Sequence, residues 1–167
     1  MSISRFRLET LGKQDRSTFE CGVEALDRYF RTQASQDVKK GACVCYIAIE
    51  RETDAIVGFY TLSAADIPVT EIDPEQIRKF PRYPTVPAAR VGRLAIDRRF
   101  RGLGLGNALI TDATIRAVNS GMGVYAMIVD AKDDNAAAFY RHHGFAFYGS
   151  SPNKLIAPIR TLLARSP

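Results

Sequence analysis

Three glycines alternate with bulky residues at one place in the chain and are surrounded by arginines. The glycines are Gly102, Gly104 and Gly106, and the arginines are Arg98, Arg99 and Arg101. A strand pattern precedes them and a helical pattern follows, so a helix N-terminus would present unpaired backbone N–H groups to one point. Glycine lets the backbone approach a ligand, and arginine adds cationic donors for phosphate oxygens. The loop predicts a phosphate-binding site; a tight turn with solvated arginines is the structural alternative.

Two familiar phosphate motifs fit this loop poorly. A P-loop requires G-x-x-x-x-G-K-[ST], and no lysine follows these glycines, which disfavours kinase or NTPase chemistry. The Rossmann pattern G-x-G-x-x-G fits at Gly104 and Gly106 but places Leu109 third, although Asp130 ends the next strand where a ribose contact would lie. The motif begins beyond the middle of the chain, which leaves no room for a doubly wound nucleotide domain.

The three cysteines, Cys21, Cys43 and Cys45, predict neither a metal site nor a disulfide framework. Their number is odd, and the C-x-C pair lies in an apolar stretch with no second ligand pair elsewhere. We expect them to be small buried residues.

The hydrophobic pattern predicts an α/β (α+β) protein, with a mixed sheet and helices on its faces. Strands are predicted at Phe6–Leu11, Ala42–Glu50, Ala55–Ala65, Ala88–Asp97, Gly123–Ala131, Phe145–Gly149 and Leu155–Leu163. Helices are predicted at Asp15–Lys40, which could be split in two, at Leu105–Asn119 and at Asp133–His143. Five prolines make Asp66–Pro87 mostly a surface excursion, with Glu75–Lys79 as a candidate short helix.

Length and composition are those of one globular domain, which we place at residues 1–167. The chain has 167 residues, of which 46% are hydrophobic and 25% charged. It contains no apolar run long enough to span a bilayer, and the N-terminal MSISRFRLET has no signal-like core, so we expect a cytoplasmic protein that does not bind membranes. The net charge of +5 indicates an anionic partner.

The glycine loop resembles the acetyl-CoA signature [QR]-x-x-G-x-[GA] of the GNAT N-acetyltransferases. Arg101-x-x-Gly104-x-Gly106 matches it, after a strand that contains Leu94-Ala95-Ile96. The later segment from Asn135 through Phe139-Tyr140 to Gly144-Phe145 matches a second family pattern in part, with a shorter spacer before the Phe-Tyr pair. The resemblance implies a GNAT fold, with a mixed central sheet of about six to seven strands flanked by helices.

This resemblance implies that acetyl-CoA is the cofactor. Its pyrophosphate would be held by the backbone amides of Arg101, Gly102, Leu103, Gly104, Leu105, Gly106 and Asn107. Its pantetheine arm would pair with Leu94, Ala95 and Ile96, where a backbone N–H would also serve the oxyanion, and its thioester would lie beside Asn135 and Tyr140.

Tyr140 is the candidate that returns a proton to the departing thiolate. A phenol has a pKa of about 10 in water, so it is protonated and able to donate at neutral pH. The alternative is that Phe139 and Tyr140 are two packing aromatics, of which only one faces inward. His142 and His143, the only histidines, lie at a helix end before Gly144 and are expected to be solvated.

The early segment Phe19-x-Cys21-Gly22-x-x-x-Leu26-Asp27 resembles the opening of a GNAT branch whose members are toxins of toxin–antitoxin pairs. That resemblance implies acetylation of the α-amine of aminoacyl-tRNA, inhibition of translation, a ribbon-helix-helix antitoxin as partner and, as in many such toxins, a homodimer. An α-amine has a pKa of about 8, so it needs no strong enzymic base. Basic residues expected to flank the cleft as tRNA contacts are Lys39, Lys40, Arg78, Lys79, Arg82, Arg90, Arg93, Arg98 and Arg99.

Two alternatives to this function stay open. The first is a GNAT enzyme that acetylates a small-molecule or protein amine. The second is a non-catalytic regulator that binds acetyl-CoA or nucleic acid, which Tyr140 argues against.

Overall fold

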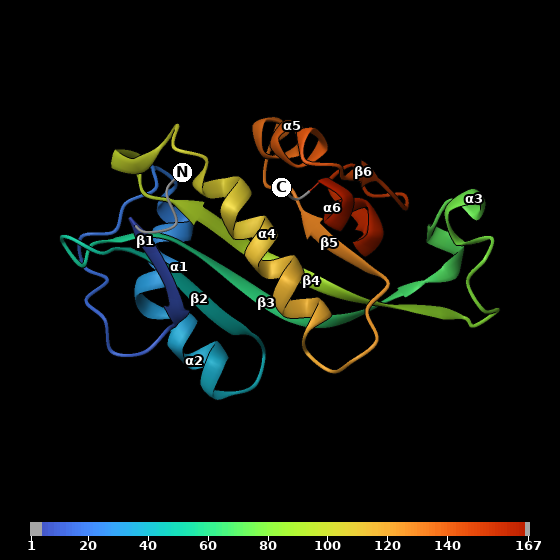
Figure 1. The fold of residues 1–167 in the computed structure, drawn as a ribbon, viewed down its shortest axis with the longest axis horizontal. Coiled ribbons are helices and arrows are strands. Elements are labelled where there is room, and N and C mark those ends of the chain that lie inside the picture. The colour runs from blue at the N-terminus through green and yellow to red at the C-terminus, as the bar shows by residue number, and fades with distance from the viewer. Residues whose placement is uncertain (1–4, 166–167) are drawn as a thin grey trace. The chain divides into compact units, whose positions relative to one another are not determined.

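The computed structural model describes residues 5–165 as a mixed α/β fold, which confirms the predicted fold class (Figure 1). Its seven strands are β1 Phe6–Thr10, β2 Val44–Glu50, β3 Ile56–Pro68, β4 Thr85–Ile96, β5 Ala126–Asp130, β6 Ala146–Phe147 and β7 Lys154–Pro158. They are hydrogen-bonded in the order β1-β2-β3-β4-β5-β7-β6. The β1–β2, β2–β3, β5–β7 and β6–β7 pairs are antiparallel, and the β4–β5 pair is parallel.

Six α-helices and two short 3-10 turns connect these strands. The helices are α1 Glu24–Thr32, α2 Ala34–Lys39, α3 Pro74–Ile77, α4 Leu105–Val118, α5 Asp134–His142 and α6 Ile159–Arg165, and the turns are η1 Val69–Glu71 and η2 Arg98–Phe100. Along the chain the residues form two compact units: a first unit of residues 5–63 and 92–110, and a second unit of residues 64–91 and 111–165. The strands β3 and β4 and the helix α4 each contribute residues to both units.

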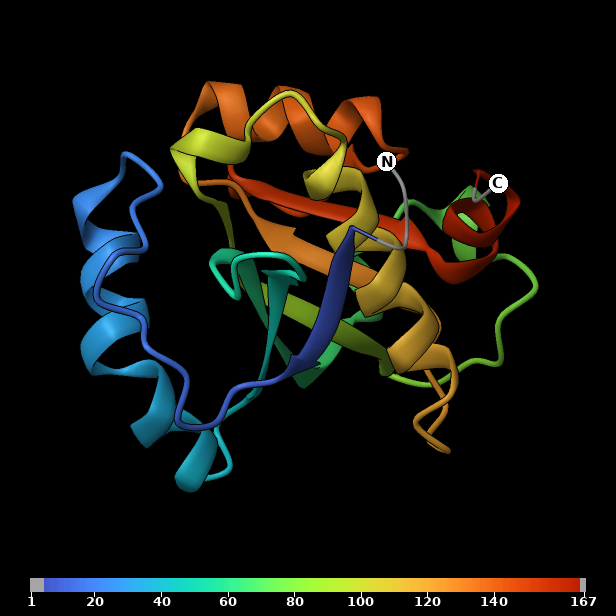
Figure 2. The same cartoon turned by 60° about the vertical axis from the view of Figure 1, so that its left-hand side comes forward.

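The first unit is organised around stacked phenylalanines. The rings of Phe30 and Phe59 are parallel with centroids 4.2 Å apart, and Phe19 meets each of them edge-on. These rings join α1 to β3, and Ile47 on β2 lies in the same buried cluster. The helices α1 and α2 accordingly lie next to one another beside β2 (Figure 2). This packing fixes where the segment before α1 must run.

The core of the second unit is aliphatic and centres on β5. Ile128 on β5, Ile156 on β7 and Val86 on β4 belong to one buried cluster with Ile67. Four of the five β5 residues are buried, as expected for a strand that has neighbours on both edges. The register pairs Ile128 with Ile156 in the antiparallel β5–β7 ladder.

The predicted helical region Asp15–Lys40 is only partly helical. Helix begins at Glu24, nine residues later than predicted, because Gly22 has a φ of 92° and the residues before it make contacts outside any helix. The split into α1 and α2 is confirmed.

Three other boundaries differ from the predictions. The strand predicted at Leu155–Leu163 ends at Pro158, and helix α6 follows, because an apolar run does not by itself distinguish strand from helix. β3 extends to Pro68 and β4 starts at Thr85, so the excursion is shorter than Asp66–Pro87. The strand predicted at Phe145–Gly149 is reduced to the two residues of β6.

Within residues 5–165, no helix is long and apolar enough to cross a membrane. The first four residues of the N-terminal stretch MSISRFRLET lie outside the described part.

Candidate functional site

The last five residues of β4 present an open backbone edge. The backbone N–H of Arg93 donates to Thr61 Oγ1 at 3.0 Å and that of Asp97 to the carbonyl of Val57 at 2.8 Å, so alternate residues face β3. The residues between them, Leu94 and Ile96, therefore direct their N–H and C=O groups to the opposite edge. On that edge the β4–β5 ladder pairs residues 88–91 only, with residues 126–129. An extended ligand can add to this edge.

The glycine loop follows directly and leads into α4. Gly102 and Gly104 have φ values of 77° and 78°, and a Cβ on either would meet no atom within 4 Å. Glycine is therefore needed at these positions for the left-handed backbone conformation and not for a close packing contact. Gly106 lies within the first turn of α4.

The start of α4 leaves backbone donors available. The first helical hydrogen bond runs from the N–H of Ala108 to the carbonyl of Gly104 at 3.1 Å. The N–H groups of residues 104–107 precede it and have no acceptor within the helix. Four donors and the positive end of a 14-residue helix thus face the loop.

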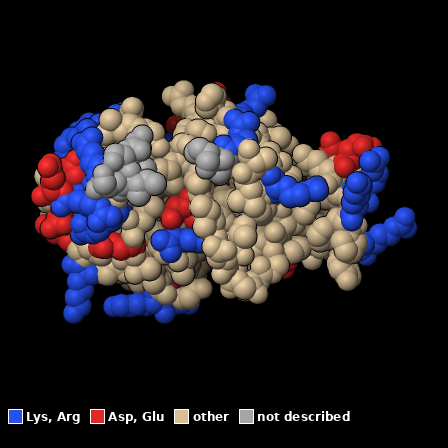
Figure 3. Space-filling view, in the orientation of Figure 1, with Lys and Arg blue, Asp and Glu red and all other residues tan. Residues whose placement is uncertain are grey.

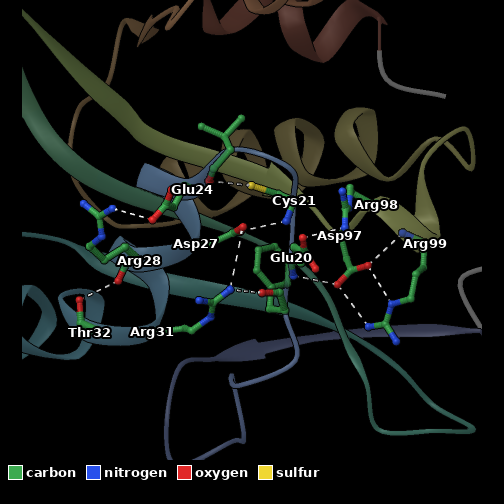
Figure 4. Close-up of polar contacts among 12 residues, drawn as sticks. Glu20, Cys21, Glu24, Asp27, Arg28, Arg31, Thr32, Asp97, Arg98 and Arg99 are labelled. Atoms are coloured by element: carbon green, nitrogen blue, oxygen red, sulfur yellow. Dashed lines mark hydrogen bonds and ion pairs between the residues drawn. The ribbon is translucent and has the colours of Figure 1, made fainter.

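The arginines around the loop have partners in the fold, and Figure 4 shows those of Arg98 and Arg99. Arg98 pairs with Glu20 at 2.7 Å, and Arg99 pairs with Asp97 at 3.0 Å. The Nη2 atom of Arg101 donates to the carbonyl of Cys21 at 2.5 Å. All three side chains therefore have partners from the first unit, whereas the backbone donors of the loop do not.

Asp97 is the buried centre of these contacts, with 1% of its surface exposed. Its carboxylate accepts from the N–H of Arg99 at 2.9 Å, which caps η2, and from the N–H of Glu20 at 3.1 Å. Burial acts to raise the pKa of Asp97, but hydrogen bonds from Arg99 and from these backbone groups outweigh it and lower the pKa. The carboxylate is thus ionised at neutral pH. No role was predicted for it from the sequence, although an Asp directly after a strand and directly before a helical turn is a capping signal.

Tyr140 lies in α5, which is capped at its start by Asp133, whose side chain accepts from the N–H of Ala136 at 2.8 Å. The Tyr140 ring is 7% exposed and packs edge-on against Phe139 and Phe145. Phe139 itself is only half-buried, so one member of the Phe-Tyr pair faces inward, as predicted.

The hydroxyl of Tyr140 differs from its buried ring in its access to the surface. Within the described residues it has no hydrogen-bond partner, and none of their fully enclosed side-chain oxygens lacks one. The hydroxyl must therefore reach accessible surface. Burial raises the pKa of Tyr140 to about 12, so the group is a proton donor over the whole physiological range.

The neighbours of Tyr140 on α5 match the predictions only in part, since His142 is solvated as predicted and His143 is not. Asn135 is exposed in the first turn. His142 is exposed in the last turn and His143 is half-buried at the C-cap, ahead of Gly144 with a φ of 100°. Burial lowers the pKa of His143, which keeps this imidazole neutral at neutral pH.

The predicted tRNA-binding residues are mostly exposed, and several have partners. Arg78 pairs with Glu75 at 3.8 Å, and the guanidinium of Arg93 lies 3.7 Å from the ring centroid of Tyr29. Figure 3 shows blue and red atoms next to one another at α3 and intermixed around β1 and α1. Exposed basic residues of the predicted set with no ion pair inside residues 5–165 are Lys39, Lys40, Lys79, Arg82 and Arg93; Arg90 is half-buried.

The predicted site residues are divided between the two units. The first unit contains the open edge and the loop, residues 94–107, together with Lys39, Lys40 and Arg93; the second unit contains Asn135, Tyr140 and the other basic residues. Cys21 and Cys45 are buried and Cys43 is half-buried, and no disulfide joins any of the three to another described residue. No group of His, Cys, Asp and Glu in the described residues could hold a metal ion.

A search of family models matches residues 11–145 to the acetyltransferase (GNAT) family. The matched residues include the open edge, the glycine loop and Tyr140.

Two curated relatives cover most of the chain. "Probable toxin TacT" of Sinorhizobium fredii (strain NBRC 101917 / NGR234) is 26% identical over 90% of this chain and 88% of its own. The "tRNA-acetylating toxin" of Mycobacterium tuberculosis (strain ATCC 25618 / H37Rv) is 33% identical over 85% of this chain and 84% of its own.

Two solved structures of one further protein are similar over nearly the whole chain. AtaT complexed with acetyl-methionyl-tRNAfMet gives a TM-score of 0.85 at 26% identity, with 95% of this chain and 98% of that one covered. The crystal structure of AtaTR bound with AcCoA gives a TM-score of 0.81 at 26% identity, with 96% and 98% covered.

Proposed function

We infer the function from one premise: the chain belongs to the acetyltransferase (GNAT) family, and it is an acetyltransferase. We propose that it transfers the acetyl group of acetyl-CoA to the α-amine of the amino acid carried by a charged tRNA, and so blocks translation as a toxin. The relatives named as toxins and the AtaT complex with acetyl-methionyl-tRNA support this substrate.

One contrast within the loop carries the proposal: the arginine side chains already have hydrogen-bond or ion-pair partners, whereas the backbone N–H groups of residues 101–107 have none within the described part of the chain. The diphosphate of acetyl-CoA needs several N–H groups at one point, and residues 101–107 with the start of α4 offer them. Gly102 and Gly104 leave open space where a Cβ would be, so a large anion can approach the main chain. The donor set fits acetyl-CoA, whose crystal structure with AtaTR supports the assignment.

The open edge of β4 fits the rest of the same molecule. The pantetheine arm contains amide groups that can pair with Leu94 and Ile96 as an added strand would. One of these backbone N–H groups also serves the oxygen of the thioester as negative charge develops on it. Ala95 contributes by holding the strand against β3.

The chemical step needs few side chains from this protein. Bound acetyl-CoA supplies the activated acyl group. The neutral α-amine attacks the thioester carbon, the new N–C bond forms, and the C–S bond breaks. Tyr140 gives its hydroxyl proton to the departing sulfur and regains a proton from the acylated nitrogen through solvent, while Asn135 lies beside the thioester. An amine with a pKa of about 8 is partly neutral at pH 7, so this mechanism requires no histidine base.

The charged-tRNA substrate gives the basic side chains a role. We assign phosphate contacts to Lys39, Lys40, Arg78, Lys79, Arg82, Arg90, Arg93, Arg98 and Arg99, with the unpaired ones among them contributing most. A ribbon-helix-helix antitoxin, a homodimer, a single domain over residues 1–167 and a cytoplasmic location complete the proposal.

The test supplies the purified protein with radiolabelled acetyl-CoA and a panel of acceptors. The panel contains charged tRNAs, the same tRNAs without amino acid, free amino acids and a lysine-containing peptide. We expect label on charged tRNA only, released with the amino acid when the ester is hydrolysed. Equal or faster labelling of free amines would favour the small-molecule or protein-amine alternative. Acetyl-CoA binding with no labelling of any acceptor would favour the non-catalytic regulator.

A further inference from the structure

The segment before α1 lies against the glycine loop although about 80 residues of chain separate them. It comprises residues 19–22, Phe-Glu-Cys-Gly, and Figure 4 shows its polar contacts with α1, with Asp97 and with Arg98. The contacts fall into two sets, one that builds the segment and one that joins it to the loop.

The first set fixes the segment on α1. The N–H of Cys21 donates to the carboxylate of Asp27 at 2.9 Å, and Asp27 is buried. Arg31, one turn later on α1, donates to the carbonyl of Phe19 at 2.9 Å and lies 4.0 Å from Asp27. With the Phe19 ring in the aromatic core, the segment has a determined position before the loop is considered.

The second set joins Glu20 to the start of the loop. Its N–H donates to Asp97 at 3.1 Å, its carbonyl accepts from the N–H of Arg98 at 2.9 Å, and its carboxylate pairs with the Arg98 side chain at 2.7 Å. The backbone of β4 is thereby held in line as it leaves the sheet.

Arg101 completes the junction from the other side. Its Nη2 donates to the carbonyl of Cys21 at 2.5 Å. A Cβ on Gly22 would come within 2.9 Å of that same nitrogen, and the φ of 92° at Gly22 lies in the left-handed region that favours glycine. Gly22 and Arg101 therefore depend on one another.

We propose that residues 19–22 act as a bracket for the acetyl-CoA loop, and that Arg101 is a positioning residue of this bracket and not a phosphate ligand. The inference rests on the proposed function, since it concerns how the acetyl donor, acetyl-CoA, is held. The bracket sets where the N–H groups of residues 102–107 point, and those groups bind the diphosphate. Loss of the bracket must therefore weaken acetyl-CoA binding and leave the chemical step at Tyr140 unchanged.

A double-mutant cycle tests the bracket in the full chain. The variants are Arg101→Ala, Gly22→Ala and both together, and the readouts are calorimetric affinity for acetyl-CoA, KM for acetyl-CoA and kcat with charged tRNA. Because a hydrogen bond from a charged group is lost, we expect each single variant to bind acetyl-CoA about 10- to 100-fold more weakly. The double variant should be no weaker than the weaker single one, with kcat at saturating acetyl-CoA within about twofold of wild type.

Two matched variants control for general damage. Gly41→Ala introduces a side chain at a φ of 76° where a Cβ would have open space. Arg16→Ala removes an arginine whose side chain donates to the carbonyl of Phe30 on α1 at 2.7 Å and not to residues 19–22. Both should retain wild-type acetyl-CoA affinity, and Arg101→Lys should recover part of the loss because its ammonium can also donate to the Cys21 carbonyl.

Losses at Arg101 and Gly22 that multiply in the double variant would overturn the bracket, since independent effects point to a direct phosphate contact by Arg101. Wild-type affinity in either single variant would overturn it as well. Circular dichroism spectra compared with wild type identify a variant that is unfolded, and Arg101→Lys then carries the test. Failure of the proposed function is a different result: wild type would bind acetyl-CoA but label no tRNA.

Discussion

The glycine loop and helix α5 divide the work of the protein in opposite ways. In the loop, the side chains of Arg98, Arg99 and Arg101 all contact partners within the first unit. The backbone N–H groups of the loop are therefore the groups available to bind a phosphate. In α5, the backbone is closed into a capped helix, and the hydroxyl of the buried Tyr140 has no hydrogen-bond partner in the described residues.

This difference teaches that the two kinds of site respond to different substitutions. A backbone site is insensitive to its own side chains except where they set main-chain geometry, so its critical residues are glycines and the groups that hold the loop. A side-chain site fails when one atom is removed. The four predictions below, from the largest effect to the smallest, separate these behaviours.

Removing the Tyr140 hydroxyl should have the largest effect. Tyr140→Phe keeps the buried ring and its packing but removes the proton donor, so kcat should fall by about 100-fold or more, with unchanged affinity for acetyl-CoA. Rates with charged tRNA and calorimetry with acetyl-CoA measure the two quantities. Tyr148→Phe, at another buried tyrosine, is the matched control and should keep its rate. A Tyr140→Phe enzyme with wild-type kcat would remove α5 from the mechanism.

The pH dependence of the rate should follow the titration of the substrate amine and not that of Tyr140. The rate at saturating acetyl-CoA should rise about tenfold per pH unit up to the amine pKa of about 8, because only the neutral amine attacks. It should then stay level, since Tyr140 donates only while protonated and its pKa is raised to about 12. An aminoacyl-tRNA analogue with an amide link avoids ester hydrolysis at alkaline pH. A fall centred near pH 10, the ordinary phenol value, would show that the hydroxyl is solvated like a free tyrosine.

A strained backbone in the loop should have an intermediate effect, and only on the affinity for acetyl-CoA. Gly104→Ala places a side chain at a φ of 78°, which costs about 1–2 kcal/mol and should weaken acetyl-CoA binding by roughly tenfold. The kcat at saturation should be unaffected. Gly121→Ala, at a φ of 83° with equally open surroundings, carries the same strain away from the loop and should bind normally. Equal loss in both variants would show that the effect is one of stability alone.

Removing exposed lysines should have the smallest effect, and only on the binding of charged tRNA. Lys39→Ala with Lys40→Ala should raise KM for charged tRNA several-fold and reduce its salt dependence by about one to two ion equivalents. Affinity for acetyl-CoA should stay as in wild type. Lys13→Ala, an exposed lysine outside the proposed set, serves as control. An unchanged salt dependence in the double variant would place the acceptor stem elsewhere.

Local patterns were enough to predict the loop. The spacing of Gly102 and Gly104, the strand before them and the helix after them all lie within residues 85–118, and periodicity detects such elements. Tyr140 was predicted through its resemblance to a family pattern, because a Phe-Tyr pair on a helix carries no chemistry by itself. The mixed sheet followed from the order of elements.

Contacts distant in sequence were not predictable. The pairs Glu20–Asp97, Glu20–Arg98 and Cys21–Arg101 join residues 77, 78 and 80 positions apart, and nothing in a single sequence shows such pairing. For the same reason helix was predicted from Asp15, although residues 19–22 are held outside the helix by Asp97 and Arg101. The strand predicted at residues 155–163 was wrong for another reason: this segment is mostly apolar, with Arg160 and Thr161 as its polar residues, and such a run fits strand or helix equally.

The central claim is that main-chain donors of the glycine loop hold the diphosphate of acetyl-CoA, and calorimetry with two ligands tests it most directly. Acetyl-CoA is compared with S-acetyl-pantetheine, which has the same thioester and arm but no diphosphate. We predict that acetyl-CoA binds at least about 100-fold more tightly, because several charge-assisted hydrogen bonds are lost with the diphosphate. Equal affinity for the two ligands would contradict the account.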